Sequence, residues 1–367
     1  MTDLAELTTL RVGGPAKRVV APTSEEELIR LVSGCDAAGE PVLVIGGGSN
    51  LLVGDAGFDG TVIRTDRLRG VEPEDVQACS GAFLKVAAGE PWDDFVAYCV
   101  GQAETRQGFV GVEALSGIPG LVGSTPIQNV GAYGQEVSQT IARVRVWDRQ
   151  LNQVKTLFNL DCRFGYRDSL FKRNPGRYVV LSVSFQLALG KHSTPLRYGE
   201  LARRLGVEEG GTAPLADVRA AVLALRRGKG MVLDVADHDT WSAGSFFTNP
   251  FLTPEQAAAL PPEAPRFSAA RQLFGKGGLR HVADDRVKTS AAWLIEHAGF
   301  GKGYGTPPAT LSTKHCLALT NRGGATAADL VCLAREIRDG VERAFGVRLL
   351  PEPVLVGVSL DRDDADR

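Results

Sequence analysis

Apolar residues recur along the chain at two spacings, one typical of helices and one typical of strands. Ser24 precedes three glutamates in a capping-box pattern, and the apolar residues that follow share one helical face: Leu28, Leu31, Val32 and Cys35. This helix is expected to stop near Gly39. Further helices are predicted at four places: from Pro91, and over 215–227, 290–299 and 326–345.

Strands are predicted between these helices. They are expected in PVLVI (41–45) and ARVRVWD (142–148), and the closing segment VRLLPEPVLVGVSL (347–360) predicts a last strand that contains Pro351 and Pro353. In YVVLSVSFQLAL, six apolar residues are expected on one side of a half-buried strand: Val179, Leu181, Val183, Phe185, Leu187 and Leu189. Since strands and helices are mixed without a strict βαβ repeat, the predicted fold class is α+β.

Size and charge narrow the classes of function. A chain of 367 residues with 44% hydrophobic content predicts two or three domains, with a boundary near Gly228. Lys and Arg total 41 against 43 Asp and Glu, which argues against a nucleic-acid partner. The longest apolar runs are too short for a bilayer, and the first residues lack the pattern of a signal peptide. We therefore expect a soluble, cytoplasmic protein without a membrane partner.

The six cysteines are scattered, with no C-x-x-C pair and no histidines at zinc spacing, so no metal site is expected. They are predicted to be reduced and mostly buried. His315 and Cys316 are neighbours, but on a strand adjacent side chains point to opposite faces. A Cys/His nucleophile is therefore not favoured.

Two glycine-rich loops indicate a dinucleotide. GGGSN (46–50) follows a predicted strand, but Leu51 stands where a Rossmann fingerprint needs glycine, and a plain tight turn remains an alternative. The second loop, SGIPGLVGSTPIQNVGAYGQE (116–136), is long and has no helical periodicity, which is typical of functional loops. The two loops could hold the halves of an extended dinucleotide such as FAD, with hydrogen bonds from Ser49, Asn50, Ser124, Thr125, Gln128 and Asn129.

Five motifs occur in a fixed order: GGGSNLL, GIPGLVGSTPIQNVGAYG, FGYRDSLFK, AGSFFTNP and KTSAAWLIEHAGFGKG. From about Thr9 to Val356 the chain resembles the UDP-N-acetylenolpyruvoylglucosamine reductase family, in the subtype with a tyrosine-bearing YGEL loop. The resemblance implies a two-part FAD-binding unit of the vanillyl-alcohol-oxidase (PCMH) type and a C-terminal α+β substrate-binding domain. The implied divisions are FAD-binding subdomains at 1–66 and 67–228, a substrate-binding domain at 229–347, and a closing strand with a charged tail, expected to be disordered, at 348–367.

The resemblance also implies a reaction. NADPH reduces non-covalent FAD, and hydride from flavin N5 then reaches C3 of UDP-N-acetylglucosamine enolpyruvate, which gives UDP-N-acetylmuramate for peptidoglycan. Ser245 in the GSFF motif would donate a proton to C2, Arg167 would hold the substrate carboxylate, and Glu352 would be the second catalytic residue. Taken alone, Ser245 could cap a backbone group, Arg167 could pair with Asp168, and Glu352 could be an exposed acid on an edge strand.

The same resemblance implies two binding sets. The cofactor set is Gly46, Gly47, Gly48, Ser49, Asn50, Gly117, Gly123, Ser124, Thr125, Gln128, Asn129, Gly131 and Ala132. The substrate set is Tyr166, Tyr198, Lys229, Asn249 and His315. A core tyrosine, a turn asparagine and a helix-end lysine are the alternatives for Tyr166, Asn249 and Lys229. Thr248 and His315 depart from the lysine and glutamine that the family pattern favours at these positions.

Two other functions remain open. A flavin oxidase of the same fold usually attaches its flavin through a His or Cys beside the loops, and segments 46–60 and 116–136 contain neither. A non-catalytic module that binds flavin or nucleotide sugar would not need to retain Arg167, Ser245 and Glu352 together. The expected partner is a small nucleotide-sugar molecule, and the chain is expected to be a monomer.

Overall fold

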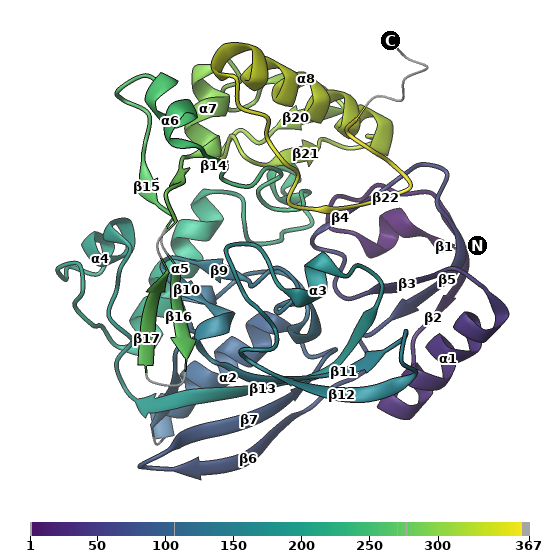
Figure 1. Ribbon diagram of the computed structural model, residues 1–367, viewed down its shortest axis with the longest axis vertical. Helices are drawn as coiled ribbons and strands as arrows, with labels where there is room; N and C mark the ends of the chain where they lie inside the picture. The colour runs from purple at the N-terminus through teal and green to yellow at the C-terminus, as the bar shows by residue number, and fades with distance from the viewer. Residues whose placement is uncertain (1, 106, 270, 276–277, 283, 362–367) are drawn as a thin grey trace. The chain divides into compact units, whose positions relative to one another are not determined.

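A computed structural model shows how the chain folds (Figure 1). It describes residues 2–105, 107–269, 271–275, 278–282 and 284–361. The chain divides into two compact units. Unit 1 comprises residues 1–16, 48–58 and 233–367, and unit 2 comprises residues 17–47 and 59–232.

The division predicted from the resemblance, 1–66, 67–228, 229–347 and 348–367, stays a prediction. The compact units group the first residues and the segment after the GGGSN glycines with the C-terminal part of the chain. Residues 362–367 of the predicted tail lie outside the described residues. The same holds for residues 270, 276–277 and 283 of the segment that follows the proline-rich stretch.

Unit 2 is built on an antiparallel sheet with the strand order β12-β11-β13-β7-β6 (Figure 1). Its strands are β6 (Val71–Gln77), β7 (Gly81–Ala87), β11 (Ile141–Asp148), β12 (Gln153–Phe158) and β13 (Tyr178–Gly190), and β8 (Gly108–Val110) pairs with the end of β13. Helix α2 (Trp92–Thr105) packs on this sheet through the rings of Trp92, Phe95 and Phe185, which lie within 6.0 Å of one another. The helix predicted from Pro91 is therefore confirmed.

Helix α1 (Glu25–Ala38) packs on a second cluster of buried apolar residues, which contains Leu28 and Val32. Its start is as predicted, because the Ser24 hydroxyl accepts a hydrogen bond from the Glu27 amide at 3.2 Å. It ends at Gly39, whose φ of 66° is left-handed. Beside it lie β2 (Pro15–Val20), β5 (Phe58–Arg64) and β3 (Val42–Ile45), which contains most of the predicted PVLVI strand.

Strand β13 differs from its prediction. Val180 pairs with Val146 but Ser182 pairs with Arg145, so Leu181 is an extra residue that shifts the alternation. As a result Val179 and Leu181 belong to the α1 cluster, whereas Val183, Phe185 and Leu187 belong to the α2 cluster. The prediction that these side chains share one side was wrong because the bulge reverses the alternation, and the strand is buried on both faces over most of its length.

The rest of unit 2 consists of short elements around the second glycine loop. Their bounds are η2 (Glu113–Leu115), η3 (Val122–Ser124), β9 (Gly131–Ala132), β10 (Gln135–Glu136), η4 (Val137–Gln139), α3 (Leu170–Arg173), α4 (Gly199–Arg204) and α5 (Leu215–Gly228). Helix α5 confirms the helix predicted over 215–227.

Unit 1 has its own apolar core, which includes residues of α7 (Ala291–His297) and α8 (Ala327–Phe345). Both helices were predicted, and Thr326 caps α8 in a capping box with Asp329. The last strand, β22 (Val354–Val356), pairs in parallel with β4 (Leu51–Val53). It is shorter than predicted and begins after Pro353, because proline has no amide hydrogen to give to a ladder.

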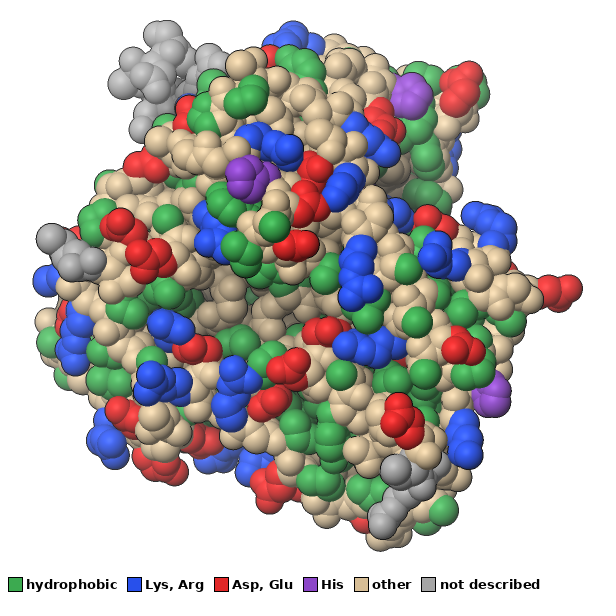
Figure 2. Space-filling view, turned by 180° about the vertical axis from the view of Figure 1, so that it is seen from behind, with side chains coloured by type: hydrophobic (Ala, Val, Ile, Leu, Met, Phe, Trp, Pro, Cys, Tyr) green, Lys and Arg blue, Asp and Glu red, His purple; other side chains and the backbone are tan. Residues whose placement is uncertain are grey.

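The remaining elements of unit 1 are short. They are β1 (Thr2–Asp3), η1 (Leu4–Leu7), η5 (His238–Thr240), β14 (Phe251–Leu252), α6 (Pro254–Ala259), β15 (Phe267–Ser268), β16 (Arg271–Gly275), β17 (Gly278–Val282), β18 (Val287–Lys288), β19 (Gly305–Thr306), β20 (Ala309–Leu311) and β21 (Leu319–Asn321). None of the described helices has the length and apolar composition that a membrane-spanning helix needs. Acidic and basic side chains are interspersed over the face seen in Figure 2.

Candidate functional site

Ser245 lies on an extended segment of unit 1 that is held by backbone hydrogen bonds. The Phe246 amide donates to the carbonyl of Leu317 at 2.7 Å, and the Phe246 carbonyl accepts from the Glu352 amide at 2.8 Å. A further bond runs from the Thr248 amide to the carbonyl of Leu350 at 3.0 Å. The predicted proton donor and the predicted second catalytic residue are therefore carried by two neighbouring segments.

The first glycine loop reaches the same place. Asn50 donates from its side-chain nitrogen to the carbonyl of Glu352 at 3.4 Å, and the Asn50 carbonyl accepts from the Val354 amide at 3.0 Å. These bonds continue the parallel pairing of β4 with β22. Unit 1 thus brings together three residues that lie far apart in the sequence: Asn50, Ser245 and Glu352.

Two phenylalanines anchor residues 242–248, the segment around Ser245 that we call the serine segment. Phe246 and Phe247 are each 1% exposed, and their ring centroids lie 5.1 Å apart in an edge-to-face arrangement. Because both rings are part of the core, they anchor the backbone that follows the partly buried Ser245.

Asn249 and His315 also belong to unit 1. The side-chain oxygen of Asn249 accepts from the amide of Ala291 at 2.9 Å, so it holds the first residue of α7. His315 and Cys316 lie in the turn between β20 and β21 and not on a strand, which corrects the geometric reason given against a Cys/His pair. Burial raises the pKa of the Cys316 thiol to about 12, and this keeps it protonated at neutral pH.

The two glycine loops lie against each other in unit 2. A Cβ at Gly46 would stand 2.5 Å from the Ser124 hydroxyl, and a Cβ at Gly47 would stand 2.9 Å from the Cα of Gly120. No side chain larger than hydrogen fits at either place without a shift. Gly47 therefore meets the second loop backbone to backbone, whereas Gly46 lies against the Ser124 hydroxyl.

Further members of the cofactor set lie along the second loop of unit 2. Gly123 approaches Ala88 so closely that its Cβ would stand 2.6 Å from the Cβ of Ala88, and Gly117 has a left-handed φ of 71°. Thr125, Gln128 and Asn129 are buried, whereas Gly131 and Ala132 form one strand of the β9–β10 hairpin.

Arg167 is held by the second loop of unit 2. Its guanidinium donates to the carbonyl of Gly131 at 2.8 Å and to the carbonyl of Asn129 at 3.4 Å. It also lies 5.5 Å from the ring centroid of Tyr166. Arg167 has a φ of 49°, so the backbone itself is in the left-handed region, as it often is at functional sites.

Asp168 forms an ion pair with Arg173 at 2.6 Å, so the carboxylate proposed as an alternative partner of Arg167 holds another arginine. Lys172 adds a support that the sequence did not suggest. Its ammonium donates to the Arg167 carbonyl at 3.0 Å and to the side-chain oxygen of Gln128 at 3.3 Å.

Tyr198 and Lys229 also meet in unit 2, together with two residues that were not predicted. The rings of Tyr198 and Tyr133 pack edge to face at 5.3 Å, and the Lys229 ammonium lies 5.9 Å from the Tyr133 ring centroid and 2.8 Å from the Glu200 carboxylate. Burial alone would lower the pKa of Lys229, but the hydrogen bond to Glu200 raises it above its usual value. The ammonium is thus charged at neutral pH. Tyr133 follows Ala132 in the glycine loop, and Glu200 lies inside YGEL, so both stood within motifs already quoted.

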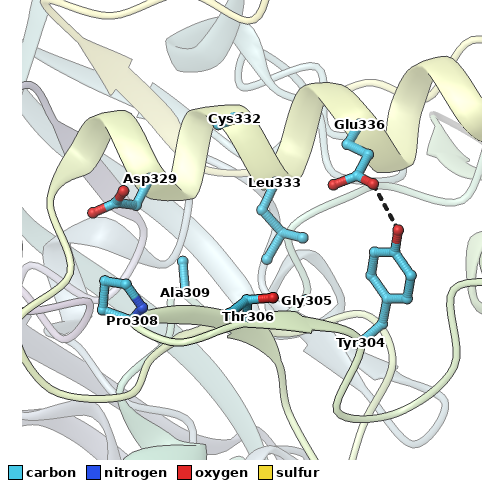
Figure 3. A pocket seen from close by; sticks show the side chains of 9 residues that line it. All are labelled: Tyr304, Gly305, Thr306, Pro308, Ala309, Asp329, Cys332, Leu333 and Glu336. Carbon is cyan, nitrogen blue, oxygen red and sulfur yellow. Dashed lines mark hydrogen bonds between the residues drawn. The ribbon is translucent and has the colours of Figure 1, made fainter.

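A hollow of about 560 Å³ lies between α8 and strands β19 and β20, where the Tyr304 hydroxyl donates to Glu336 at 2.6 Å (Figure 3). Its lining includes none of the predicted site residues. The predicted site residues therefore lie on the segments described above and not in the lining of this hollow.

Comparisons with known proteins agree with the two-part architecture. The family described as "UDP-N-acetylenolpyruvoylglucosamine reductase, C-terminal domain" matches residues 236–356, and the family described as "FAD binding domain" matches residues 16–156. The chain therefore carries an FAD-binding domain. The α+β class and the presence of a separate C-terminal domain are confirmed.

Whole-length relatives extend this finding. A UDP-N-acetylenolpyruvoylglucosamine reductase of Cutibacterium acnes is 55% identical over 360 residues, which cover 97% of this chain and 90% of the relative. One from Thermobifida fusca is 54% identical over 363 residues, which cover 97% of each. The crystal structure of the reductase from Thermus caldophilus shares the fold, with a TM-score of 0.62, 24% identity and 97% coverage of each chain. The resemblance drawn from the five motifs is confirmed, and the chain belongs to the UDP-N-acetylenolpyruvoylglucosamine reductase family.

Proposed function

We propose that this chain reduces UDP-N-acetylenolpyruvoylglucosamine to UDP-N-acetylmuramate for peptidoglycan synthesis, with FAD as its bound cofactor and NADPH as the electron donor. The observation that carries the proposal is the set of hydrogen bonds in unit 1 that join the segments carrying Asn50, Ser245 and Glu352, with Phe246 as the bonded neighbour of Ser245. It joins a predicted cofactor loop to a predicted proton donor, which is the combination that a flavin-dependent reduction of a carbon–carbon double bond requires. The family membership of the whole chain supports the same activity.

The two glycine loops would hold FAD. Gly46 and Gly47 let the first loop pack closely on the second, and the exposed Gly47 would offer its main-chain groups to a pyrophosphate. Once reduced by NADPH, the bound FAD would supply the hydride that adds to C3 of the enolpyruvyl group. The prediction that Ser49, Ser124, Thr125 and Gln128 contact the cofactor stays a prediction.

Arg167 would bind the substrate carboxylate. Addition of hydride at C3 places negative charge on C2 and on the adjoining carboxylate, so a fixed positive charge there lowers the barrier. The guanidinium is planar and permanently charged, and the carbonyls of Asn129 and Gly131 orient it. Tyr198, Lys229 and Asn249 are proposed for the nucleotide part of the substrate, where the charged Lys229 would meet the diphosphate.

Ser245 would donate the proton that C2 needs. A serine hydroxyl is a weak acid in water, but the enolate-like carbon is a strong base, and transfer is favourable where solvent is excluded. Glu352, on the neighbouring segment, would orient the hydroxyl or polarise the intermediate. His315 and Tyr166 stay candidates for substrate contact, and a cytoplasmic monomer stays the prediction for localisation and assembly.

A test of the proton donor compares Ser245→Ala with the purified wild-type protein under anaerobic conditions. We expect NADPH to bleach the flavin spectrum at the normal rate in the variant. Restoration of the spectrum by the enolpyruvyl sugar should slow by roughly 10²- to 10⁴-fold, the usual range for loss of a general acid.

A matched control is Ser33→Ala, which removes a partly buried hydroxyl that donates within α1. It should leave both half-reactions unchanged. A normal second half-reaction in Ser245→Ala would remove Ser245 from the proposed role. If only oxygen restored the spectrum of the wild-type protein, the oxidase would be the better hypothesis, and failure to take up FAD would favour neither enzyme.

A further inference from the structure

The segment that carries Ser245 has a second support. Glu352 bonds to it after Ser245, at Phe246, and Thr9 bonds to it before Ser245, at Ser242. The Thr9 hydroxyl donates to the carbonyl of Ser242, three residues before Ser245, at 2.6 Å. The Thr9 amide donates to the carbonyl of Gly48 at 3.1 Å. One buried residue, 7% exposed, therefore binds both the serine segment and the first glycine loop.

The backbone before Thr9 packs closely on the backbone of the first glycine loop. Gly48 has a left-handed φ of 62°, and a Cβ at this position would overlap the carbonyl oxygen of Leu7. The segment 7–9 consequently lies directly on the backbone of the loop. A shift of Thr9 would have to move the loop with it.

These bonds close a ring. The loop 48–50 is bonded to Thr9, Thr9 to the segment 242–246, this segment to Glu352, and Glu352 back to Asn50. We call this closed set of hydrogen bonds the serine ring. All of its members belong to unit 1.

The residues after Thr9 are fixed as well. Asn321 donates from its side-chain nitrogen to the carbonyls of Leu10 and Arg11, in each case at 3.1 Å. The guanidinium of Arg11 lies 4.7 Å from the ring centroid of Trp241, the residue next to Ser242. Thr9 thus acts from a rigid base and not from a mobile end of the chain.

We propose that Thr9 is a positioning residue for the proton transfer, because its hydroxyl fixes the Ser242 carbonyl and thereby the place of Ser245 relative to the loop 48–50. The inference rests on the proposed function of Ser245. Two of the four bonds of the serine ring have backbone donors, which every residue type except proline supplies. The other two start from the side chains of Thr9 and Asn50, and of these only the Thr9 hydroxyl bonds directly to the segment that carries Ser245. Loss of this bond frees the segment on one side while the Glu352 side stays closed.

The experiment compares Thr9→Val with Thr8→Val. Thr8 is also 7% exposed, and its hydroxyl donates within its own turn to the carbonyl of Val12 at 3.0 Å. Both variants exchange a hydroxyl for a methyl and lose one hydrogen bond of the same type, but only Thr9→Val opens the serine ring. Thr9→Ser keeps the hydroxyl and loses only the methyl group. Thr9→Ala removes the hydroxyl without adding the extra methyl of valine, and it serves if valine is too large for the site.

Three quantities are measured: the rate of flavin reduction by NADPH, the rate of flavin reoxidation by the enolpyruvyl sugar, and the amide hydrogen exchange of residues 241–248 in the protein without FAD. We expect Thr9→Val to slow reoxidation roughly tenfold to a hundredfold, as a small misplacement of a catalytic group does. Reduction by NADPH should stay within a factor of two, and exchange in 241–248 should accelerate about tenfold or more. Thr8→Val and Thr9→Ser should match the wild-type protein in all three.

Two results would overturn the inference: equal behaviour of Thr9→Val and Thr8→Val, or a parallel fall of both half-reactions in Thr9→Val, which marks a merely structural residue. Ser245→Ala, measured beside them, separates this inference from the proposed function. A normal reoxidation rate in Ser245→Ala contradicts the proposed function and the kinetic role of Thr9 with it. A slow Ser245→Ala beside a normal Thr9→Val contradicts the role of Thr9 alone.

Discussion

Ser245 in unit 1 and Arg167 in unit 2 are proposed to act on the same substrate, yet the two units hold them in different ways. Around Ser245 most of the supporting bonds join backbone amides to backbone carbonyls, as between Glu352 and Phe246, and the bond from the Thr9 hydroxyl to the Ser242 carbonyl is a side-chain exception. Around Arg167 they start from side chains, namely from its own guanidinium and from the Lys172 ammonium. A segment held mainly by its backbone is expected to tolerate replacement of most side chains, whereas a loop held mainly by side chains is expected to be sensitive to it.

Asn129 in unit 2 is likewise held by hydrogen bonds of its side chain. Its nitrogen donates to Glu136 at 2.8 Å and to the carbonyl of Gly165 at 3.0 Å, and its oxygen accepts from the Ser138 amide at 3.1 Å. The residue is 1% exposed and has a left-handed φ of 46°. Asparagine is among the few residue types other than glycine that adopt this conformation readily. It ties the glycine loop to the segment that carries Arg167, in addition to its predicted contact with the cofactor.

The largest effect on stability is therefore expected for Asn129→Ala. The change leaves the Gly165 carbonyl and the Ser138 amide without these partners and places alanine in a left-handed conformation. The free energy of unfolding should fall by about 3 kcal/mol. Urea titration followed by circular dichroism measures the loss, and KM for the enolpyruvyl sugar should rise because the carbonyl that orients Arg167 moves.

Asn152→Ala is the matched control for this change. Asn152 has a similar φ of 51°, but it lies exposed in the turn between β11 and β12. Its replacement costs only the backbone preference, about 1 kcal/mol or less, and leaves KM unchanged. Equal losses in the two variants would show that backbone conformation, and not the side-chain bonds, maintains the Arg167 loop.

A substitution of Asp148 tests whether the stability of unit 2 can change while the geometry of its glycine loops stays the same. This buried carboxylate lies at the end of β11, where it binds Arg177 at 2.9 Å and Lys155 at 3.0 Å. The hydrogen bond from Arg177 is the main cause that lowers the pKa of Asp148 from 3.8 to about 2. The ionised form is thus favoured by folding, and its contribution is present above about pH 4 and is lost as the pH falls towards 2.

Asp148→Asn should lower the free energy of unfolding at pH 7 by about 2 kcal/mol and flatten its dependence on pH between about 4 and 2. Urea titrations at several pH values measure both effects. The two half-reactions should keep their wild-type rates, since Asp148 contacts neither glycine loop through a bond described above. Slower half-reactions in this variant would mean that any loss of stability in unit 2 disturbs the site, which would weaken the argument from Asn129.

The sequence predicted what local rules determine. Ser24 and Thr326 start their helices as expected because a capping hydroxyl acts within three residues. The bulge at Leu181 could not be predicted, since its register is set by partners on another strand. Thr9 gave no signal either, because its partner Ser242 lies 233 residues away. The family motifs indicated Ser245 and Glu352, but they did not indicate which residues close the ring around them.

The smallest effect is expected at Thr248, where the family pattern favours lysine. The Thr248 amide donates to the Leu350 carbonyl at 3.0 Å, and lysine would supply the same amide. The side chain is partly exposed, and its hydroxyl makes a weak bond of 3.4 Å to the same carbonyl.

Thr248→Lys should therefore change the free energy of unfolding by less than about 0.5 kcal/mol. It should also change the rate of flavin reoxidation by less than about threefold, because the backbone bond that places the segment is kept. Rapid mixing measures the reoxidation rate and urea titration measures the stability of this variant. Together they test whether the segment around Ser245 tolerates a changed side chain. A tenfold change in the reoxidation rate would mean that the side chain at position 248 reaches the substrate, and it would contradict the tolerance expected of a segment held mainly by its backbone.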